Sequence, residues 1–190
     1  MSIILDGTNG IVTPDIDSGV STLGPLTQAL NLGSTGQIVF PATQNASANA
    51  NTLDDYEEGT WTPVGQGASG SAGAYSQTSF GANYTKIGNL VYVAGAITVN
   101  NSGSYSGDFE ITGLPFPCSD PGSNAGARGS VRLQSVNYST GGYATAETTG
   151  SGNTFFRFQV TVTNTGNNPL QVSSLTSNSY IAFSLTYYTT

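Results

Sequence analysis

Two stretches near the end of the chain alternate apolar and polar residues with a period of two. Successive side chains of a β-strand point to opposite faces of its sheet, so this period indicates half-buried antiparallel strands. The stretches are residues 154–163, TFFRFQVTVT, and residues 179–189, SYIAFSLTYYT. Their predicted inward-facing residues are Phe156, Phe158, Val160 and Val162 in the first stretch and Ile181, Phe183, Leu185 and Tyr187 in the second.

Other short stretches rich in β-branched and aromatic residues lie between turn-forming clusters of Gly, Ser, Asn and Pro. In the longest of them, residues 89–99, Gly95 is predicted to mark a bulge or a close packing point. About eight or nine such strands predict an all-β fold, an antiparallel β-sandwich. A jelly roll is the favoured topology, and an immunoglobulin-like sandwich is the alternative. Segments of helical period long enough for βαβ crossovers do not occur in the sequence, which argues against a parallel α/β fold.

The charged residues divide the chain into two parts. Residues 1–85 contain seven acidic residues and no Lys or Arg, whereas residues 86–190 contain four residues of each sign. Residues 1–52 also lack an apolar period long enough to form a core of their own. We therefore expect an extended N-terminal anchoring arm and linker over residues 1–52, followed by the β-sandwich domain over residues 53–190.

The composition excludes several classes of function. The chain has no histidine and one cysteine, so it cannot build a histidine-based catalytic triad, a thiolate zinc site or an intrachain disulfide. Its net charge of −7 has the wrong sign for binding phosphate backbones. No apolar run approaches the roughly 20 residues that span a bilayer. We expect no enzymatic activity, no catalytic residues, no cofactor, no metal, no nucleic-acid partner and no membrane insertion.

Asp54, Asp55, Glu57 and Glu58 form the one dense cluster of charge. Carboxylates suit calcium or magnesium, but the spacing departs from that of an EF-hand loop. We expect these side chains to be solvated or to contact a neighbouring chain. Cys118 has no His or Lys beside it to lower its pKa, so we expect a passive thiol.

Three arginines, Arg128, Arg132 and Arg157, are most simply explained as partners of Glu110, Glu147 or a neighbouring subunit. A patch that binds sugar or phosphate is the alternative. Tyrosines in or near Asn-, Ser- and Gly-rich loops could bind carbohydrate by ring stacking, and contacts at a core edge or between subunits are the competing explanation. These tyrosines are Tyr105, Tyr138 and Tyr143.

Three segments resemble a module of tailed-bacteriophage structural proteins that is found in tail-fibre and related virion-surface proteins. They are NANTLDDYEEGTWTPV (49–64), NYTKIGNLVYVAGAI (83–97) and ITGLPFP (111–117), and IVFPATQ (38–44) resembles the approach to that module. The DDYEEGTWTP, YTKIGN and GLPF motifs occur in the order of the family. The resemblance implies a virion structural protein, usually a homotrimer, whose β domain faces outward.

Parts of these motifs have a physical interpretation. Trp61 is predicted to anchor the first strand, which Pro63 limits to a sheet edge or a bulge. Phe116, between two prolines, is predicted to press its ring into the rim of the sandwich. Gly88 and Asn89 are expected to supply positive φ angles in a tight hairpin.

Taken together, these features predict a phage virion structural protein, a trimeric surface decoration of the cement or head-fibre kind. Its expected partners are its own copies, as a homotrimer, and other virion proteins, above all the major capsid protein. The alternative is a tail fibre or tail-associated receptor-binding protein that binds a host surface glycan. The expected location is the virion, either the outer capsid surface or the tail.

The arm is predicted to bury apolar side chains on neighbouring coat subunits, in a groove that is basic or lined by cations, because the first part of the chain is acidic. The particle-docking residues are predicted to be Ile3, Ile4, Leu5, Ile11, Val12, Ile16, Leu23, Leu26, Leu30, Ile38, Val39 and Phe40.

Overall fold

The structure is a computed structural model that describes residues 36–49, 51–119, 126–138, 142–162 and 166–189. The chain forms two units, residues 1–39 and residues 40–190. In the first unit only residues 36–39 are described, and they are exposed and outside any strand. The second unit contains the strands of the described chain. No helix in the described ranges is long and apolar enough to cross a bilayer.

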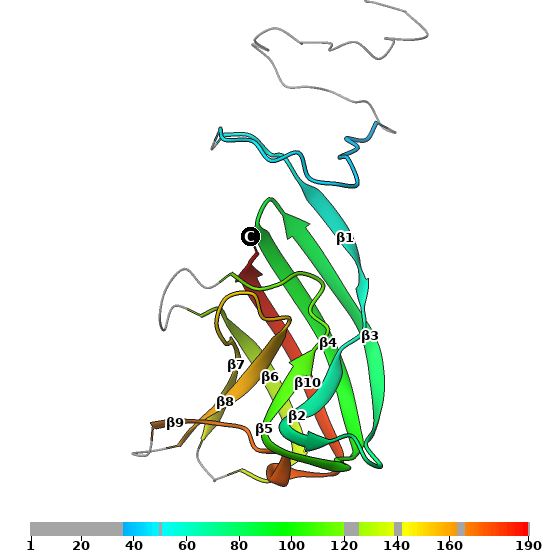
Figure 1. Ribbon diagram of the computed structural model, residues 1–190, viewed down its shortest axis with the longest axis vertical. Helices are drawn as coiled ribbons and strands as arrows, with labels where there is room; N and C mark the ends of the chain where they lie inside the picture. Colours follow the sequence, from blue (N-terminus) through cyan, green and yellow to red (C-terminus); the bar gives the residue numbers. More distant parts are fainter. Residues whose placement is uncertain (1–35, 50, 120–125, 139–141, 163–165, 190) are drawn as a thin grey trace, which may run out of the picture. The chain divides into compact units, whose positions relative to one another are not determined.

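The second unit is built almost entirely of β-strands (Figure 1). A single short 3-10 turn, η1 (Val172–Ser174), precedes the last strand. The strands are β1 (Tyr56–Trp61), β2 (Val64–Ser71), β3 (Ser76–Ile87), β4 (Leu90–Asn101), β5 (Ser104–Thr112), β6 (Arg128–Val136), β7 (Tyr143–Thr148), β8 (Phe155–Val162), β9 (Gly166–Pro169) and β10 (Leu175–Tyr188).

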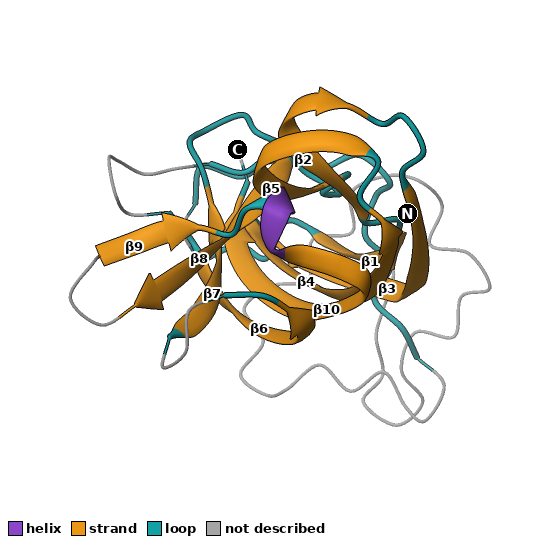
Figure 2. Ribbon diagram, turned by 90° about the horizontal axis from the view of Figure 1, so that it is seen from below, coloured by secondary structure: helices purple, strands orange, loops and turns teal. Residues whose placement is uncertain are grey.

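The strands form one antiparallel sheet in the order β1-β3-β4-β10-β6-β7-β8-β5-β2, and β9 adds to β8. The sheet curls around a central core, as the view along the strands shows (Figure 2). The predicted all-β antiparallel sandwich is confirmed. Its facing halves belong to one continuous sheet, where the favoured jelly roll would have two separate ones. β1 and β2 are consecutive in the chain but lie at opposite edges of this sheet, so the prediction that Pro63 follows an edge strand is also confirmed.

The core contains the inward faces that the period of two predicts. Phe183 lies at its centre, with its ring centroid 5.1 Å from that of Phe156 and 6.0 Å from that of the anchor Trp61. The side chain of Val162 lies outside the described part. The other predicted inward residues are each at most 5% exposed, namely Phe156, Phe158, Val160, Ile181, Phe183, Leu185 and Tyr187.

Gly95 occupies a close packing point, as predicted. A Cβ atom at this position would lie 2.8 Å from the Cβ of Ala82 and 3.3 Å from the Cζ of Phe183. The register of β3 against β4 shifts between Phe80 and Asn83, so Ala82 lies within an irregularity of the strand. The small residue at position 95 allows this part of β3 to approach β4.

The sandwich has two distinct ends (Figure 1). At the proximal end β1 begins, β10 ends, and β3 and β4 are joined by the two-residue turn at Gly88 and Asn89. Gly88 has a φ of 57°, whereas Asn89 is not among the described residues with positive φ. The expected positive φ is therefore confirmed for Gly88 and is wrong for Asn89. At the distal end lie β9, η1 and the C-terminal end of β6.

Candidate functional site

The three motifs meet at the proximal end of the sandwich. Asp55 and Lys86 are each only 5% exposed, and the Lys86 Nζ donates a hydrogen bond to the Asp55 carboxylate. The same ammonium lies 5.5 Å from the centroid of the Phe116 ring, a favourable cation–π arrangement. The ion pair and the ring thus join one residue from each motif.

A second contact strengthens this junction. The Tyr84 hydroxyl donates to the Glu57 carboxylate, and the Tyr84 ring meets Phe116 edge-on at 5.5 Å between centroids. The Glu57 carboxylate raises the pKa of Tyr84 to about 12, since it stabilises the neutral hydroxyl as a donor. Tyr187 donates from its hydroxyl to the Phe116 carbonyl at 3.0 Å. The prediction that Phe116 presses into the rim is confirmed, and the motifs hold the start of β1 and the segment after β5 against β3.

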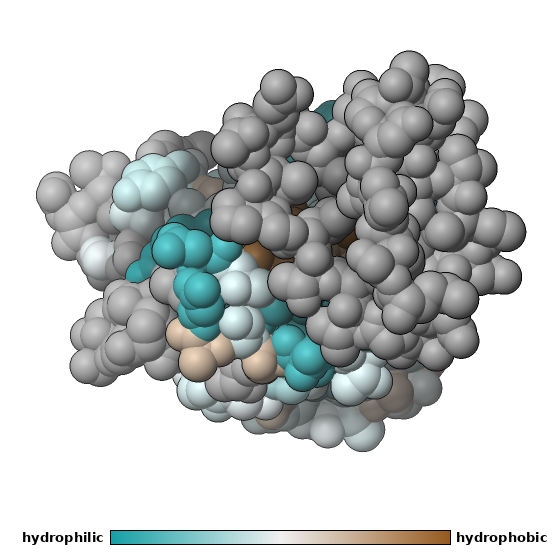
Figure 3. Space-filling model, turned by 90° about the horizontal axis from the view of Figure 1, so that it is seen from above, coloured by the Kyte–Doolittle hydropathy of each residue, from teal (hydrophilic) through white to brown (hydrophobic). Residues whose placement is uncertain are grey.

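The remaining two acids of the 54–58 cluster also have partners within the chain. Asp54 accepts from the Ser47 backbone N–H at 2.8 Å, which lowers the pKa of its carboxyl. Glu58 accepts from the Tyr56 hydroxyl at 2.8 Å, and this bond raises the pKa of Tyr56. Among the described residues, no three His, Cys, Asp or Glu side chains gather as metal ligands. In the view onto the proximal end, strongly hydrophilic residues stand in groups among residues of intermediate hydropathy (Figure 3).

Two of the predicted arginine partners are present. The Arg157 guanidinium bonds Glu110 at 2.5 Å, and Arg128 approaches Glu147 at 2.8 Å. Arg157 also approaches Asp108 at 3.1 Å, so it bridges two carboxylates of β5. These arginines neutralise acids of their own chain.

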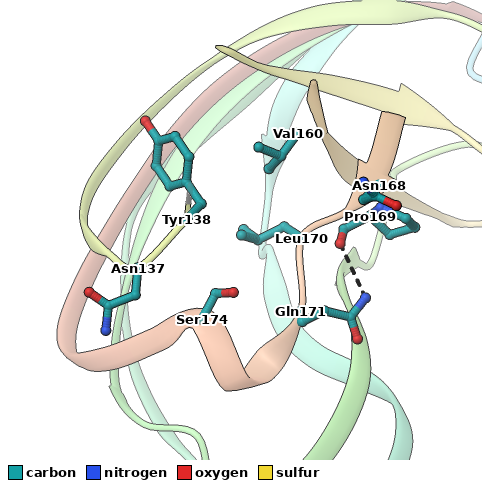
Figure 4. Close-up of a pocket in the computed structure, with 8 residues that line it drawn as sticks. All are labelled: Asn137, Tyr138, Val160, Asn168, Pro169, Leu170, Gln171 and Ser174. Carbon is teal, nitrogen blue, oxygen red and sulfur yellow. Dashed lines mark hydrogen bonds between the residues drawn. The ribbon is translucent and has the colours of Figure 1, made fainter. Parts of the chain in front are cut away.

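A pocket of about 490 Å³ opens at the distal end (Figure 4). It lies between the segment after β6, the inner side of β8 and the segment that runs from β9 into η1. None of its eight lining residues is charged. They are Asn137, Tyr138, Val160, Asn168, Pro169, Leu170, Gln171 and Ser174.

Hydrogen bonds and packing hold the walls of this pocket in place. The Asn137 backbone N–H donates to the Ser174 carbonyl at 2.7 Å, which ties the end of β6 to η1. Leu170 and Val160, 2% and 5% exposed, form the apolar floor. Opposite them stands Tyr138, which is 39% exposed (Figure 4). The pocket is therefore lined by an accessible aromatic side chain on one side and by apolar side chains on the other.

On the polar side of the pocket, the Gln171 side chain is held in place by charged residues that lie outside the pocket. The Gln171 amide donates to Asp108 at 2.7 Å and to the Pro169 carbonyl at 3.1 Å. Asp108 is in turn held by Arg157. This arrangement orients the Gln171 amide without bringing a charge into the lining of the pocket.

Such a lining suits a neutral ligand that has both an apolar face and several hydroxyl groups. Volumes of about 300–1,000 Å³ with a few fixed polar groups are typical of small-molecule sites. A tyrosine ring can stack on the C–H face of a sugar, and amide side chains can exchange hydrogen bonds with its hydroxyls. The chemistry of the pocket thus matches a saccharide unit better than an ion.

The structure does not bring the three predicted tyrosines together. Tyr138 lines the pocket, whereas Tyr105 meets the Tyr75 ring edge-on at 5.3 Å as part of the core rim. Tyr143, 65% exposed, pairs with Thr161 on the outer side of the sheet. The sequence does not single out the other lining residues, because isolated Asn and Gln residues in loops form no recognisable spacing pattern.

Most of the predicted docking residues of the arm lie outside the described residues. Of the three that are described, Ile38 and Val39 are 64% and 86% exposed. Phe40 is partly buried, with its ring centroid 6.3 Å from that of Tyr56. The residues outside the described part are Ile3, Ile4, Leu5, Ile11, Val12, Ile16, Leu23, Leu26 and Leu30.

Comparison with known proteins gives one informative likeness. No family model matches the chain, and no curated protein matches it. The chain is similar in structure to the Dettilon tailspike protein (gp208), with a TM-score of 0.56 and 18% sequence identity. The match covers 70% of this chain and 24% of the tailspike chain. At this identity the likeness shows the fold alone: the β-sandwich occurs as a part of a much longer tailspike protein.

Proposed function

We propose that this chain is a receptor-binding component of a phage tail, which binds a saccharide of the host surface in its distal pocket. The observation that carries the proposal is the uncharged pocket, which Tyr138 lines together with the apolar side chains of Val160 and Leu170. The motif resemblance to phage virion proteins and the fold shared with part of a tailspike protein support a location on a phage particle.

The geometry of the domain supports the same assignment. The chain enters the sandwich at the proximal end, where β1 begins, and the pocket lies at the other end. An attachment made through the N-terminal residues would therefore leave the pocket facing away from the particle.

A glycan array of neutral and acidic bacterial oligosaccharides, followed by calorimetry on the hits, tests this proposal. We expect binding to neutral sugars, and Tyr138→Ala should weaken it by about tenfold or more, because loss of a stacking ring removes roughly 1.5 kcal/mol or more. Tyr143→Ala is the matched control, since Tyr143 is exposed but does not line the pocket. A silent array, or equal losses in the two variants, would overturn the proposal.

Decoration of the capsid surface is a second proposal. Its support is the adjacent apolar residues Ile38 and Val39, which are exposed in the described part of the first unit. On this proposal the protein docks on the major capsid protein through residues 1–52, as a homotrimer. Immunogold labelling of the phage distinguishes the two locations, since gold on the head supports decoration and gold on the tail contradicts it.

Removal of residues 1–39 tests the anchoring arm itself. This deletion is sharper than one at residue 52, because residues 40–190 form one compact unit. The shortened protein should fold and lose its attachment to the particle. Attachment that survives the deletion would refute the arm in either location.

Absence of enzymatic activity also stays a prediction. Release of reducing ends from a bacterial polysaccharide by the purified chain would contradict it.

A further inference from the structure

The large exposed hydrophobic residues are concentrated on one part of the sheet. Of the twelve in the described chain, five lie on the outer face of β1, β3, β4 and β10 at the proximal end. They are between 38% and 51% exposed. We call them the proximal band: Tyr56, Ile87, Leu90, Tyr92 and Tyr188.

The strand register makes this band continuous. Ile87 pairs directly with both Tyr56 and Leu90, and Leu90 pairs with Tyr188. These four residues therefore form one row across four strands, and Tyr92 lies in the next row of the same face. Contiguous apolar side chains on a surface are typical of interaction sites, whereas single exposed residues are ordinary.

Small uncharged residues continue the face towards the distal end. The rows below Tyr92 on β4 and β10 pair Ala94 with Ser184 and Ala96 with Ala182. The short side chains of the Ala94–Ser184 row leave the sheet flat there, whereas the packed rings of Phe80 and Tyr180 flank the Ala96–Ala182 row, in which Ala96 is 8% exposed.

The charged residues that border the face are engaged within the chain. The Glu58 carboxylate accepts from Tyr56. Arg132, which was expected to pair with Glu110, Glu147 or a neighbouring subunit, has its guanidinium carbon 5.7 Å from the Tyr180 ring centroid and donates to Gln134 at 3.2 Å. Glu58 and Arg132 thus stand at the two borders of the face, and the five residues of the proximal band between them are uncharged.

From this charge pattern we infer that the proximal band is the surface through which copies of this chain associate. The chain carries a net charge of −7, so two copies repel each other wherever their acidic residues meet. The five residues of the proximal band carry no charge, so a contact between two bands avoids that repulsion. This inference goes beyond the proposed function, because it concerns a surface separate from the distal pocket.

The area of the face is consistent with a second copy of this chain as its partner. At about 4.8 Å between strands and roughly 3.3 Å per residue, nine residues each of β3, β4 and β10 and the six of β1 give a face of about 520 Å². Two such faces bury on the order of 1,000 Å², about the least area expected of a specific interface. A second copy of the face thus provides the area that a weak but specific contact needs.

Sedimentation velocity of the full chain over a range of concentrations tests the inference. We expect the wild-type chain to be oligomeric and Tyr92→Glu to dissociate at about tenfold or more higher concentration, because it places a charge in the centre of the contact. Tyr143→Glu is the matched control, an exposed tyrosine on β7 that should leave the oligomer intact. Thr186→Glu, on an exposed residue of β10 beside Tyr92, repeats the test without removal of a large side chain.

The outcomes are separable from those of the glycan experiment. Circular dichroism confirms that each variant is folded, and a monomeric Tyr92→Glu chain that still binds the array sugar supports this inference alone. A wild-type chain that is monomeric at every concentration would overturn the inference. So would an oligomer that survives both Tyr92→Glu and Thr186→Glu, since the copies would then use another surface.

Discussion

Lys86 and Asp55 form an ion pair in the interior of the proximal end, where each residue is 5% exposed. The two residues are 31 positions apart in the chain. Removal of one partner from a buried pair leaves the other charge without compensation, at a cost of about 3–5 kcal/mol. The pair fastens the start of β1 to the end of β3.

Asp55→Asn and Lys86→Met should each lower the melting temperature by roughly 6–20 °C, from about 2–4 °C for each kcal/mol in a domain of this size. The double variant should be less destabilised than the sum of the two. Arg128→Met is the matched control, because the Arg128–Glu147 pair has a half-exposed arginine and such pairs contribute about 0–1 kcal/mol. Calorimetric melting curves measure all four. Equal melting of Lys86→Met and Arg128→Met would contradict the structural role of the buried pair.

The Tyr84–Glu57 bond predicts a loss of stability in alkaline solution. The pKa of Tyr84 is raised from 10.0 to about 12 in the folded chain, so the bond contributes its full stability below pH 10 and loses it as the pH rises through 12. Urea unfolding of the wild-type chain and of Tyr84→Phe should differ at pH 8 and converge by pH 12. A difference that persists unchanged at pH 12 would show that the hydroxyl acts in some other way.

Gly95 and Gly81 form a matched pair for testing the packing of β3 against β4. Gly95→Ala should destabilise the domain by about 1–3 kcal/mol, since the new methyl group would overlap the Cβ of Ala82. Gly81→Ala meets nothing within 4 Å and should be neutral or stabilising by up to about 1 kcal/mol, because alanine restricts the unfolded chain. Chemical denaturation measures both. Similar effects of the two substitutions would refute the close packing at Gly95.

The rate at which a thiol reagent labels Cys118 measures opening of the segment that contains Phe116. Its thiol is 1% exposed and donates to the Gly150 carbonyl at 3.1 Å. Burial keeps thiol reagents away, so labelling should occur only through opening of the structure. Lys86→Met should accelerate labelling at the same reagent concentration, because it weakens the neighbouring contact with Phe116. Rapid labelling of the wild-type chain would contradict the burial.

The strands could be predicted from the sequence because their period is local. Phe156, Phe158 and the inward residues of β10 are buried as the alternation requires. The partner of Asp55 could not be predicted in the same way, since the pairing of β1 with β3 places Lys86 beside it and no local pattern encodes that pairing. The sequence thus suggests a solvated acidic cluster where the fold makes internal contacts.

The pocket was predictable only in part. Tyr138 is conspicuous as an aromatic residue near polar loops, but its neighbours come from three segments of the chain. The Asn137–Ser174 bond and the short turn η1 bring those segments together. Since the bond joins backbone atoms of residues 37 positions apart in the sequence, the side-chain types at these positions do not reveal it.

The position of β1 at the sheet edge determines how the domain withstands tension. A pull on the chain ahead of Asp55, opposed by a load at the distal end, acts along the length of β1. The six residue pairs between β1 and β3 then resist together in shear instead of opening one at a time. Lys86 holds Asp55 where the force first arrives. Under such a load, the β1–β3 pairs must break together, which needs a larger force than breaking them in turn.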